Sequence, residues 1–229
     1  MLEALRTEVY EANLELVRRG MVLYTFGNAS GISRDDGLVA IKPSGVPYEK
    51  MTPADMVITD LEGRVVEGSL RPSSDLATHV ALYRAFPSIG GVVHTHSRHA
   101  TAWAQAGREI PCFGTTHADY FYGPVPVTVP LTPAEIESEY EANTGEAIIR
   151  LMEGRDPLGC PAALVASHGP FCWGKSATAA AHMAVIVEEL AAMAMQTLAI
   201  NPAAPPISEA LRDRHYFRKH GPKAYYGQK

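Results

Sequence analysis

Ile89-Gly90-Gly91-Val92-Val93-His94-Thr95-His96 is a mainly apolar run that ends in two imidazoles two residues apart. Its length and its neighbouring turn residues predict a buried strand over 91–96. Alternate side chains of a strand share a face, with their Cα atoms roughly 6.5–7 Å apart, so His94 and His96 can converge on one ion. Zinc takes three or four protein ligands, so this pair is half of a site. The pair alone is equally consistent with two polar residues at the exposed end of a strand.

Two further residues can complete a metal site. The apolar run Ala162 to Ser167 predicts a second strand that leads directly into His168, a third candidate ligand. Asp75 follows Pro72-Ser73-Ser74 at the point where a helix is predicted to begin. Its carboxylate is either a helix cap or a fourth ligand, and the local pattern leaves both interpretations open.

Composition excludes several classes of protein. The chain has 229 residues, which suits one large domain and falls short of the roughly 250 that most complete eight-fold α/β barrels need. Lys and Arg total 20 against 25 Asp and Glu, the net charge is -5, and no long basic run occurs, so nucleic acid is not an expected partner. Three scattered cysteines indicate a reducing compartment: Cys112, Cys160 and Cys172.

Neither the first residues nor the apolar stretch 177–200 is predicted to target a membrane. The first residues lack the basic start and long apolar core of a signal peptide. The apolar stretch Ala177 to Ile200 contains His182, Glu188, Glu189 and Gln196, which predicts a buried amphipathic helix instead of a membrane span. We therefore expect a cytoplasmic protein with no membrane partner.

The hydrophobic periodicity predicts an α/β fold. Spacings of three and four, helix caps and glycine stops predict helices over 2–20, 78–86, 98–106, 132–151, 177–200 and 208–219. Short β-rich segments between turns predict strands over 38–41, 56–59, 91–96 and 162–167. Several of these strands follow one another through turns, so we expect a mixed sheet with helices on both faces, in a single domain over 1–229.

Five motifs resemble those of the L-ribulose-5-phosphate 4-epimerases, a branch of the class II aldolase/adducin superfamily. They are Pro72-Ser73-Ser74-Asp75, Val93-His94-Thr95-His96-Ser97, Thr115-Thr116-His117-Ala118-Asp119-Tyr120, Ser167-His168-Gly169-Pro170 and the ending over 219–228. The resemblance covers nearly the whole chain. It implies a three-layer α/β/α domain with a largely antiparallel sheet. It also implies a homotetramer in which the tail 207–229 contributes to the active site of a neighbouring subunit.

The resemblance also implies a ligand set and a substrate site. Asp75, His94, His96 and His168 would hold one divalent metal per subunit, with zinc expected and other divalent ions as alternatives. Related aldolases that act on L-fuculose 1-phosphate are expected to carry Glu at the position of Asp75, so Asp75 favours an epimerase. The residues that match substrate- and phosphate-binding segments are Gly27, Asn28, Lys42, Ser44, Gly45, Ser73 and Ser74. Without the resemblance, most of these would be ordinary turn or surface residues.

The implied reaction interconverts L-ribulose 5-phosphate and D-xylulose 5-phosphate. C4 lies β to the C2 carbonyl, so its proton is not activated, and the chain lacks the glycine fingerprint of a dinucleotide site. Cleavage of C3–C4, rotation of the tethered aldehyde and recombination remain as the accessible route. A metal can stabilise the negative charge that this cleavage leaves on the ketose fragment.

Inversion at C4 requires proton transfer on two faces, and Asp119 and Tyr226 match the acid/base pair of the family. His215 matches a position that assists Tyr226, and Thr115 is expected to orient Asp119 or the aldehyde. Local pattern alone would make Asp119 a loop carboxylate, Tyr226 a packed aromatic of the tail and His215 an exposed helical residue.

Two other functions remain as alternatives. A class II aldolase acting on a sugar phosphate such as L-fuculose 1-phosphate would share the bond-breaking step and release the aldehyde. An adducin-like interaction module would keep the fold and lose the metal. The presence of His94, His96 and His168 disfavours the module.

Overall fold

One seven-stranded sheet forms the centre of the molecule. The computed structural model describes residues 2–227, so the outermost residues of the predicted domain 1–229 and tail 207–229 lie outside the described part. The strand order is β4-β3-β2-β1-β5-β7-β6, and every ladder is antiparallel. A single isolated bridge, Val127 to Leu164, is parallel. The strands are β1 (Asn28–Ser33), β2 (Leu38–Ile41), β3 (Val57–Asp60), β4 (Val65–Glu67), β5 (Gly91–His94), β6 (Ala162–Val165) and β7 (Gly169–Gly174).

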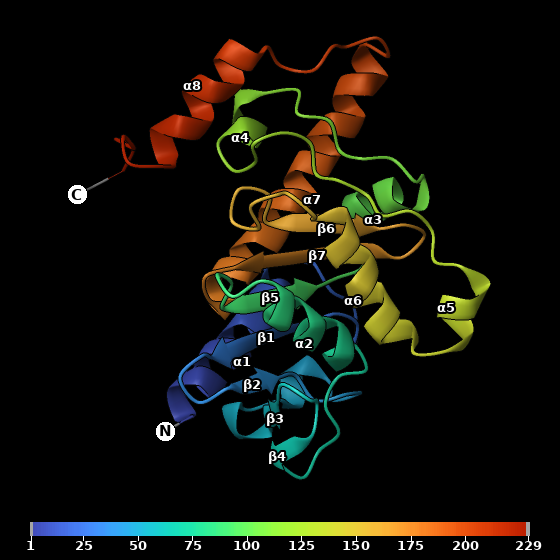
Figure 1. The fold of residues 1–229 in the computed structure, drawn as a ribbon, viewed down its shortest axis with the longest axis vertical. Helices are drawn as coiled ribbons and strands as arrows, with labels where there is room; N and C mark the ends of the chain where they lie inside the picture. Colours follow the sequence, from blue (N-terminus) through green and yellow to red (C-terminus); the bar gives the residue numbers. More distant parts are fainter. Residues whose placement is uncertain (1, 228–229) are drawn as a thin grey trace.

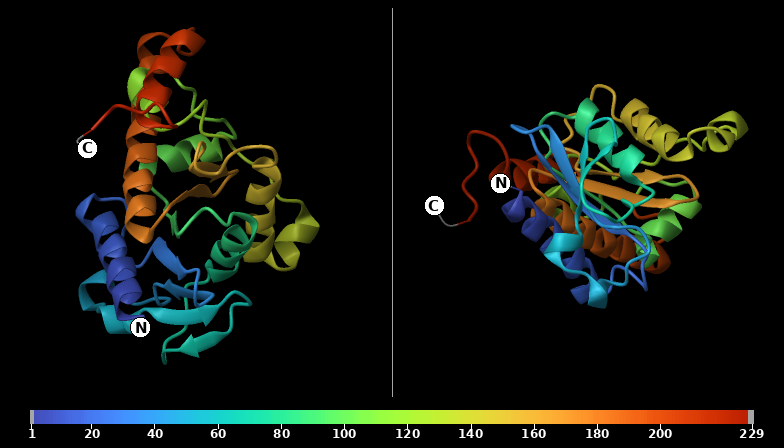
Figure 2. Two further views of the ribbon diagram at one scale, coloured as in Figure 1. Left: turned by 60° about the vertical axis from the view of Figure 1, so that its left-hand side comes forward. Right: turned by 90° about the horizontal axis from the view of Figure 1, so that it is seen from below.

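Helices cover both faces of this sheet (Figures 1 and 2). They are α1 (Glu3–Arg18), α2 (Leu76–Ala85), α3 (Arg98–Gln105), α4 (Thr115–Ala118), α5 (Pro133–Glu137), α6 (Tyr140–Leu151), α7 (Ala177–Ile200) and α8 (Glu209–Lys219). Two short 3-10 turns, η1 (Tyr48–Lys50) and η2 (Pro53–Asp55), lie between β2 and β3. The view from below shows α1 and α7 on one side of the sheet and α2 and α6 on the other (Figure 2). The predicted three-layer α/β/α fold with a largely antiparallel sheet is therefore confirmed, and the mixed character expected of the sheet is limited to the isolated parallel bridge.

The composition of the central strands matches their burial. All four residues of β5 and all six of β7 are buried, because helices cover both of their faces. Such strands consist of continuous apolar runs instead of alternating ones. The apolar run that opens the sequence analysis thus lies in the middle of the sheet, between β1 and β7.

Helix α7 is long and apolar enough to cross a membrane by length and composition alone. In the structure it packs against β5, β7, α1 and α3. Its buried positions are mostly alanine, which allows a close approach to the sheet. The expectation of a buried amphipathic helix over 177–200 agrees with this packing.

The predicted strand over 91–96 is two residues too long. β5 ends at His94. Opposite Thr95 on the neighbouring strand stands Pro170, which has no amide hydrogen to donate to a ladder. On the other side, the chain turns away before β1 at Gly27, whose φ is +73°. His96 therefore lies in irregular backbone between β5 and α3.

The predicted helix over 132–151 is two helices. α5 ends at Glu137, and α6 begins at Tyr140. A continuous helix would place like charges four residues apart, such as Glu135 with Glu139, which is unfavourable. Side chains also satisfy the last carbonyls of α5: Ser138 Oγ donates to Ala134 O at 2.8 Å, and Asn143 Nδ2 donates to Glu135 O at 2.9 Å.

Candidate active site

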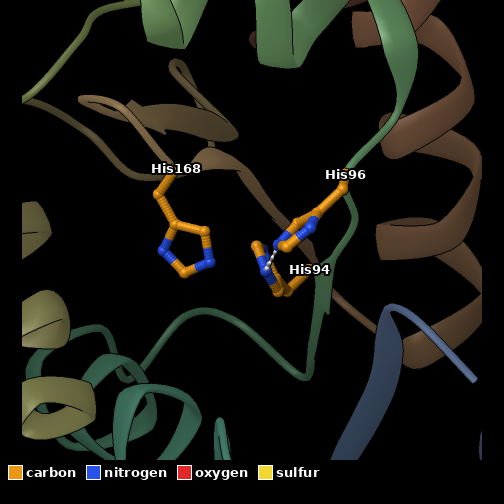
Figure 3. A group of neighbouring side chains, drawn as sticks. All are labelled: His94, His96 and His168. Atoms are coloured by element: carbon orange, nitrogen blue, oxygen red, sulfur yellow. Dashed lines mark hydrogen bonds between the residues drawn. The ribbon is translucent and has the colours of Figure 1, made fainter.

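Three histidines, His94, His96 and His168, converge where β5 ends and β6 turns into β7, and we call them the histidine cluster (Figure 3). One ligand atom from each lies within 4.8 Å of the other two. The Nε2 atoms of His94 and His96 are 3.0 Å apart. His94 comes from the end of β5, His96 from the following segment and His168 from the turn between β6 and β7. The structure therefore brings together three of the four predicted ligands.

The surrounding backbone and rings fix the orientation of these imidazoles. His94 Nδ1 lies 3.0 Å from Pro170 O, so this nitrogen carries the hydrogen and donates, which leaves Nε2 free to coordinate. The His94 ring also stacks on Phe171, with the ring centroids 4.2 Å apart. His168 Nδ1 lies 3.3 Å from the hydroxyl of Tyr140, and its other nitrogen faces the pair (Figure 3). Protein contacts thus fix the orientation of the His94 and His168 rings.

A glycine allows His168 to reach the other two histidines. A Cβ on Gly169 would lie 2.7 Å from Thr95 O, closer than real side-chain contacts. Thr95 is the residue between His94 and His96, so the turn that carries His168 packs directly on the backbone that carries the other two. Only glycine permits this approach without a shift.

The cluster suits a divalent cation by its protonation as well as its geometry. Burial lowers the pKa of His94 well below its ordinary value, and the neighbouring His168 and His96 lower it further. Burial and His96 also lower the pKa of His168, although Asp75 acts in the opposite direction. Metals bind the neutral imidazole, and the lowered pKa values of His94 and His168 favour this coordinating form at neutral pH. An all-nitrogen set open on one side fits zinc and other borderline divalent ions.

Asp75 stands beside this cluster but is not one of the groups within 4.8 Å of one another. It occupies the N-cap position of α2, yet its side chain caps nothing. Instead, its Oδ2 accepts a hydrogen bond from Asn28 Nδ2 at 2.6 Å. Asn28 faces His94 directly across the β1–β5 ladder. The side chain of Asp75 is therefore held by a neighbour of His94, which favours the ligand interpretation over the helix-cap interpretation.

Five of the seven predicted phosphate-binding residues lie on two segments that run side by side, 42–45 and 71–74. Ser44 N donates to Arg71 O and Ser73 N donates to Lys42 O, both at 2.9 Å. An isolated antiparallel bridge joins Pro43 to Pro72 between them. The exposed members of the set, Ser44, Gly45 and Ser74, line the solvent side of this pair.

Asn28 links this segment pair to the metal side of the site. Its Nδ2 lies 3.0 Å from Ser73 Oγ as well as 2.6 Å from Asp75. Gly27 precedes it in a left-handed conformation, with φ +73°, and a Cβ there would lie 3.0 Å from His94 O. Gly27, Asn28, Ser73 and Asp75 thus form one continuous arrangement beside the histidine cluster.

Lys42 is only 2% exposed, although a lysine in a turn is usually solvated. Its Nζ lies 3.3 Å from Thr25 O and 4.7 Å from the centre of the Tyr48 ring. Burial lowers its pKa to about 8. In residues 2–227 no carboxylate pairs with this ammonium, so its charge is available to a bound anion.

A second group of charged residues forms between α4 and α8. We call Asp119, His215, Arg218, Lys219 and Tyr226 the Asp119 cluster. Arg218 donates two hydrogen bonds to the carboxylate of Asp119, from Nε to Oδ1 at 3.0 Å and from Nη2 to Oδ2 at 2.6 Å. His215 Nδ1 lies 3.1 Å from Oδ1 of the same carboxylate. Lys219 Nζ is 3.4 Å away. The predicted acid/base carboxylate is therefore surrounded by cations.

Tyr226 adjoins the same cations. The ring of Tyr226 lies under Arg218 and Lys219, with the cationic centres 4.9 and 4.7 Å from the ring centroid.

Burial acts to raise the pKa of Asp119, but the hydrogen bonds from Arg218 and His215 and the charge of Lys219 outweigh it, so the pKa lies below its ordinary value. The two predicted acid/base residues, Asp119 and Tyr226, therefore lie close together in space within one subunit. Thr115 lies one turn before Asp119, whose amide donates to Thr115 O at 2.9 Å.

The two clusters lie apart in one chain. α4 and α8 stand together at one end of the long axis of the molecule, beyond the sheet (Figure 1). Among residues 2–227, no hydrogen bond, ion pair or aromatic contact joins the histidine cluster to the Asp119 cluster. The predicted site residues therefore form two clusters, and within one chain these two clusters do not contact each other.

Sequence reasoning missed several residues that contact the predicted site, among them Arg218, Lys219 and Tyr140. Arg218 and Lys219 lie three and four residues after His215, a spacing that places them on the same face of α8. This spacing was available in the sequence once His215 had been singled out. Tyr140, which contacts His168, carries no comparable sequence pattern.

Comparisons with known proteins agree with this architecture. Residues 7–195 match the model of the Class II Aldolase and Adducin N-terminal domain. The chain is 56% identical to a curated L-ribulose-5-phosphate 4-epimerase UlaF of Salmonella paratyphi C, over 100% of both chains. A solved L-fuculose 1-phosphate aldolase is 25% identical, with a TM-score of 0.78 over 93% of this chain and 94% of that one. A second such aldolase, from Thermus thermophilus, shares the fold at 24% identity and a TM-score of 0.68, over 89% of this chain and 98% of that one. The chain belongs to the class II aldolase and adducin family.

Proposed function

We propose that this chain is an L-ribulose-5-phosphate 4-epimerase, which interconverts L-ribulose 5-phosphate and D-xylulose 5-phosphate. The observation that carries the proposal is the identity of 56% to a curated epimerase over the full length of both chains. The fold is shared with aldolases that act on a different sugar phosphate, so the fold alone does not choose between the two reactions. Asp75 at the edge of the histidine cluster supports the epimerase.

The metal site comprises His94, His96 and His168, with Asp75 as the fourth ligand. The family is metal-dependent, and we propose zinc as the resident ion because three imidazoles and one carboxylate match its ligand preference. A bound divalent ion supplies Lewis acidity, which stabilises negative charge that develops on the ketose oxygens. Asn28 orients Asp75 for this role by donating a hydrogen bond to its carboxylate.

The phosphate of the substrate binds on the paired segments 42–45 and 71–74. Backbone amides and the hydroxyls of Ser44, Ser73 and Ser74 supply donors for phosphate oxygens. Lys42 supplies the positive charge from a buried position, where an ion pair is less screened than at the surface. Anchoring the phosphate retains the aldehyde fragment after C3–C4 breaks and permits rotation about its bonds.

The acid/base residues come from a neighbouring subunit. Asp119 and Tyr226 lie together in one chain, away from the histidine cluster of that chain. A metal site and an acid/base pair must both contact the substrate, so a second copy is needed to bring the two clusters together. We therefore propose a homotetramer in which the tail 207–229, with α4, completes the active site of the adjacent subunit.

Asp119 and Tyr226 transfer the proton of the C4 hydroxyl from opposite faces. In one direction, a base removes the proton from the C4 oxygen as C3–C4 breaks, and the aldehyde turns over. The other residue then returns a proton to the oxygen as the bond reforms on the opposite face. Arg218 keeps the Asp119 carboxylate ionised, so Asp119 removes the proton in one direction while the phenolic hydroxyl of Tyr226 supplies the proton on the opposite face. His215 contacts Asp119, not Tyr226, so we assign it the orientation of the carboxylate.

The enzyme acts in the cytoplasm on a small sugar phosphate. Its three cysteines are buried and unpaired, which is consistent with a reducing compartment. Neither nucleic acid nor a membrane is part of the proposed function.

A product assay tests the proposal. Purified protein loaded with zinc and incubated with L-ribulose 5-phosphate is expected to form D-xylulose 5-phosphate, and removal of the metal with a chelator is expected to abolish the conversion. Stoichiometric dihydroxyacetone and glycolaldehyde phosphate without D-xylulose 5-phosphate would overturn the epimerase and favour an aldolase.

A further inference from the structure

His96 is a predicted metal ligand that no strand holds. β5 ends two residues earlier, at His94, and the amide of Thr95 reaches Pro170 O at 3.4 Å, the limit of a hydrogen bond. The next regular element is α3, which begins at Arg98. The position of His96 therefore depends on how the start of α3 is held.

The start of α3 is held by a residue of another helix. Glu188, on α7, accepts hydrogen bonds from the amides of His99 at 2.9 and 3.1 Å and of Ala100 at 2.9 Å. It also accepts from His99 Nδ1 at 2.8 Å. Ser97, the N-cap residue of α3, makes no side-chain capping bond itself. The carboxylate of Glu188 thus replaces the local cap, 88 residues away from Ala100 in the chain.

The segment of α7 that carries Glu188 is packed firmly against the core. Val187, Leu190 and Ala191 around it are buried against the core. Trp103 Nε1 donates to Ala191 O at 3.1 Å, a second bond between α3 and the same part of α7. Glu188, Glu189 and His96 line one cavity of about 450 Å³, but of the two carboxylates only that of Glu188 is bonded to the amides of α3. The carboxylate is therefore close to the ligand and firmly attached to the sheet through α7.

Glu188 is ionised in this position. Burial acts to raise the pKa of its carboxyl, but the hydrogen bonds from the Ala100 and His99 amides outweigh burial, and the pKa lies below its ordinary value. A negative charge at a helix N-terminus is also favourable. The neighbouring Glu189, in contrast, is exposed and is not among the residues bonded to α3.

We propose that Glu188 is a positioning residue for the metal site: it clamps the first turn of α3 and thereby holds His96 where it can coordinate together with His94 and His168. The inference rests on the proposed metal site but not on the identity of the substrate. Groups that orient metal ligands typically change metal affinity by about 10- to 100-fold when they are replaced.

The test is a metal titration of apo protein at a temperature well below unfolding. Glu188→Gln removes the charge and replaces one accepting oxygen by an NH₂ group, which cannot accept a hydrogen bond from the backbone amides of α3. We expect this variant to weaken Zn²⁺ affinity about 10-fold or more. Cobalt loading gives a second readout, because the absorption of bound Co²⁺ reports its coordination, and we expect this spectrum to change. Glu189→Gln, which removes the same charge one residue away, is the matched control and is expected to retain wild-type affinity.

His96→Asn shows whether the metal site itself is correct. If His96→Asn binds Zn²⁺ as well as the wild type, the proposed ligand set is wrong, and Glu188 has no metal site to position. If His96→Asn loses affinity while Glu188→Gln keeps both wild-type affinity and the Co²⁺ spectrum, the role of Glu188 is overturned. Equal losses in Glu188→Gln and Glu189→Gln would also overturn it, because a general charge effect would then suffice. Should Glu188→Gln fail to fold, Glu188→Asp, which keeps the charge and shortens its reach, carries the same test.

Discussion

The histidine cluster and the Asp119 cluster are built in opposite ways. The first lies at the ends of the central strands, with His94 on β5 only 2% exposed and its ring held between Pro170 O and Phe171 of β7. The second is held by ion pairs between two helices, and Tyr226 is 61% exposed. The sheet provides a rigid site for an ion, whereas the helices present charged and aromatic groups outward. This difference fits the proposal that the second cluster completes the active site of another subunit.

The largest effect is expected from breaking the histidine cluster. His96→Asn removes one of three imidazoles, so we expect metal content and epimerisation to be lost together. Metal analysis after dialysis, with an activity assay on the same sample, checks this. Full metal content with no activity would place His96 outside the ligand set.

Breaking the Asp119 cluster should separate activity from metal binding. Asp119→Asn leaves an amide that cannot accept the substrate proton, and we expect kcat to fall about 10³-fold with metal content unchanged. Asp213→Asn, on α8 and paired with Arg212, is the matched control and should retain activity. Loss of metal in Asp119→Asn would contradict the separation of the two clusters.

Tyr226→Phe removes only the phenolic hydroxyl. We expect about a 10²-fold loss of epimerisation, with zinc retained, since the ring still packs on Arg218 and Lys219. Tyr225→Phe is the natural control, because Tyr225 is similarly exposed and contacts Arg214 instead. Equal losses in the two variants would show that Tyr226 has no specific acid/base role.

Gly169→Ala tests the rigid mounting of the histidine cluster. The new Cβ would lie 2.7 Å from Thr95 O, so the turn that carries His168 must shift. We expect metal affinity to fall about 10-fold by titration. Gly114→Ala, where nothing lies within 4 Å, should leave metal affinity unchanged. Wild-type affinity in Gly169→Ala would mean that the mounting is not rigid.

The smallest effect concerns Lys42 and pH. Burial lowers its pKa to about 8, so the ammonium loses its charge as the pH rises through that value. We expect KM for the sugar phosphate to be lowest below about pH 8 and to rise severalfold above it, because the phosphate loses its charge partner. Lys42→Met should raise KM and remove this dependence. An unchanged pH profile of KM in Lys42→Met would exclude Lys42 from phosphate binding.

Much of the fold could be predicted because its elements carry local patterns. The helices over 2–20, 177–200 and 208–219 and the strands over 38–41 and 56–59 follow from periodicity and turn residues, and the structure places them within a few residues. The early end of β5 could not be predicted, because it depends on a proline of a distant strand. The break at Ser138 was missed although part of its cause is local, since Ser138 bonds the carbonyl of Ala134; the bond from Asn143 to Glu135 O forms only once α6 has turned.

The candidate site shows the same limit. The spacing of His94 and His96 indicated convergence, and it occurs, but through an irregular turn instead of a strand. The fixing of Asp75 by Asn28 and of the first turn of α3 by Glu188 joins residues 47 and 88 positions apart, which no local pattern reveals. Such contacts exist only once the sheet and α7 are assembled.

Complementation between subunits tests the central proposal, a composite active site, most directly. His96→Asn and Tyr226→Phe chains carrying different tags are coexpressed, and the mixed oligomers are isolated by both tags. We expect these oligomers to regain about a quarter of wild-type activity, because random pairing in a symmetric assembly joins an intact histidine cluster to an intact Tyr226 in about one site of four. The pair His96→Asn and His94→Asn damages one cluster only and should regain nothing. Activity of the first mixture no higher than the sum of its parents would contradict the composite site.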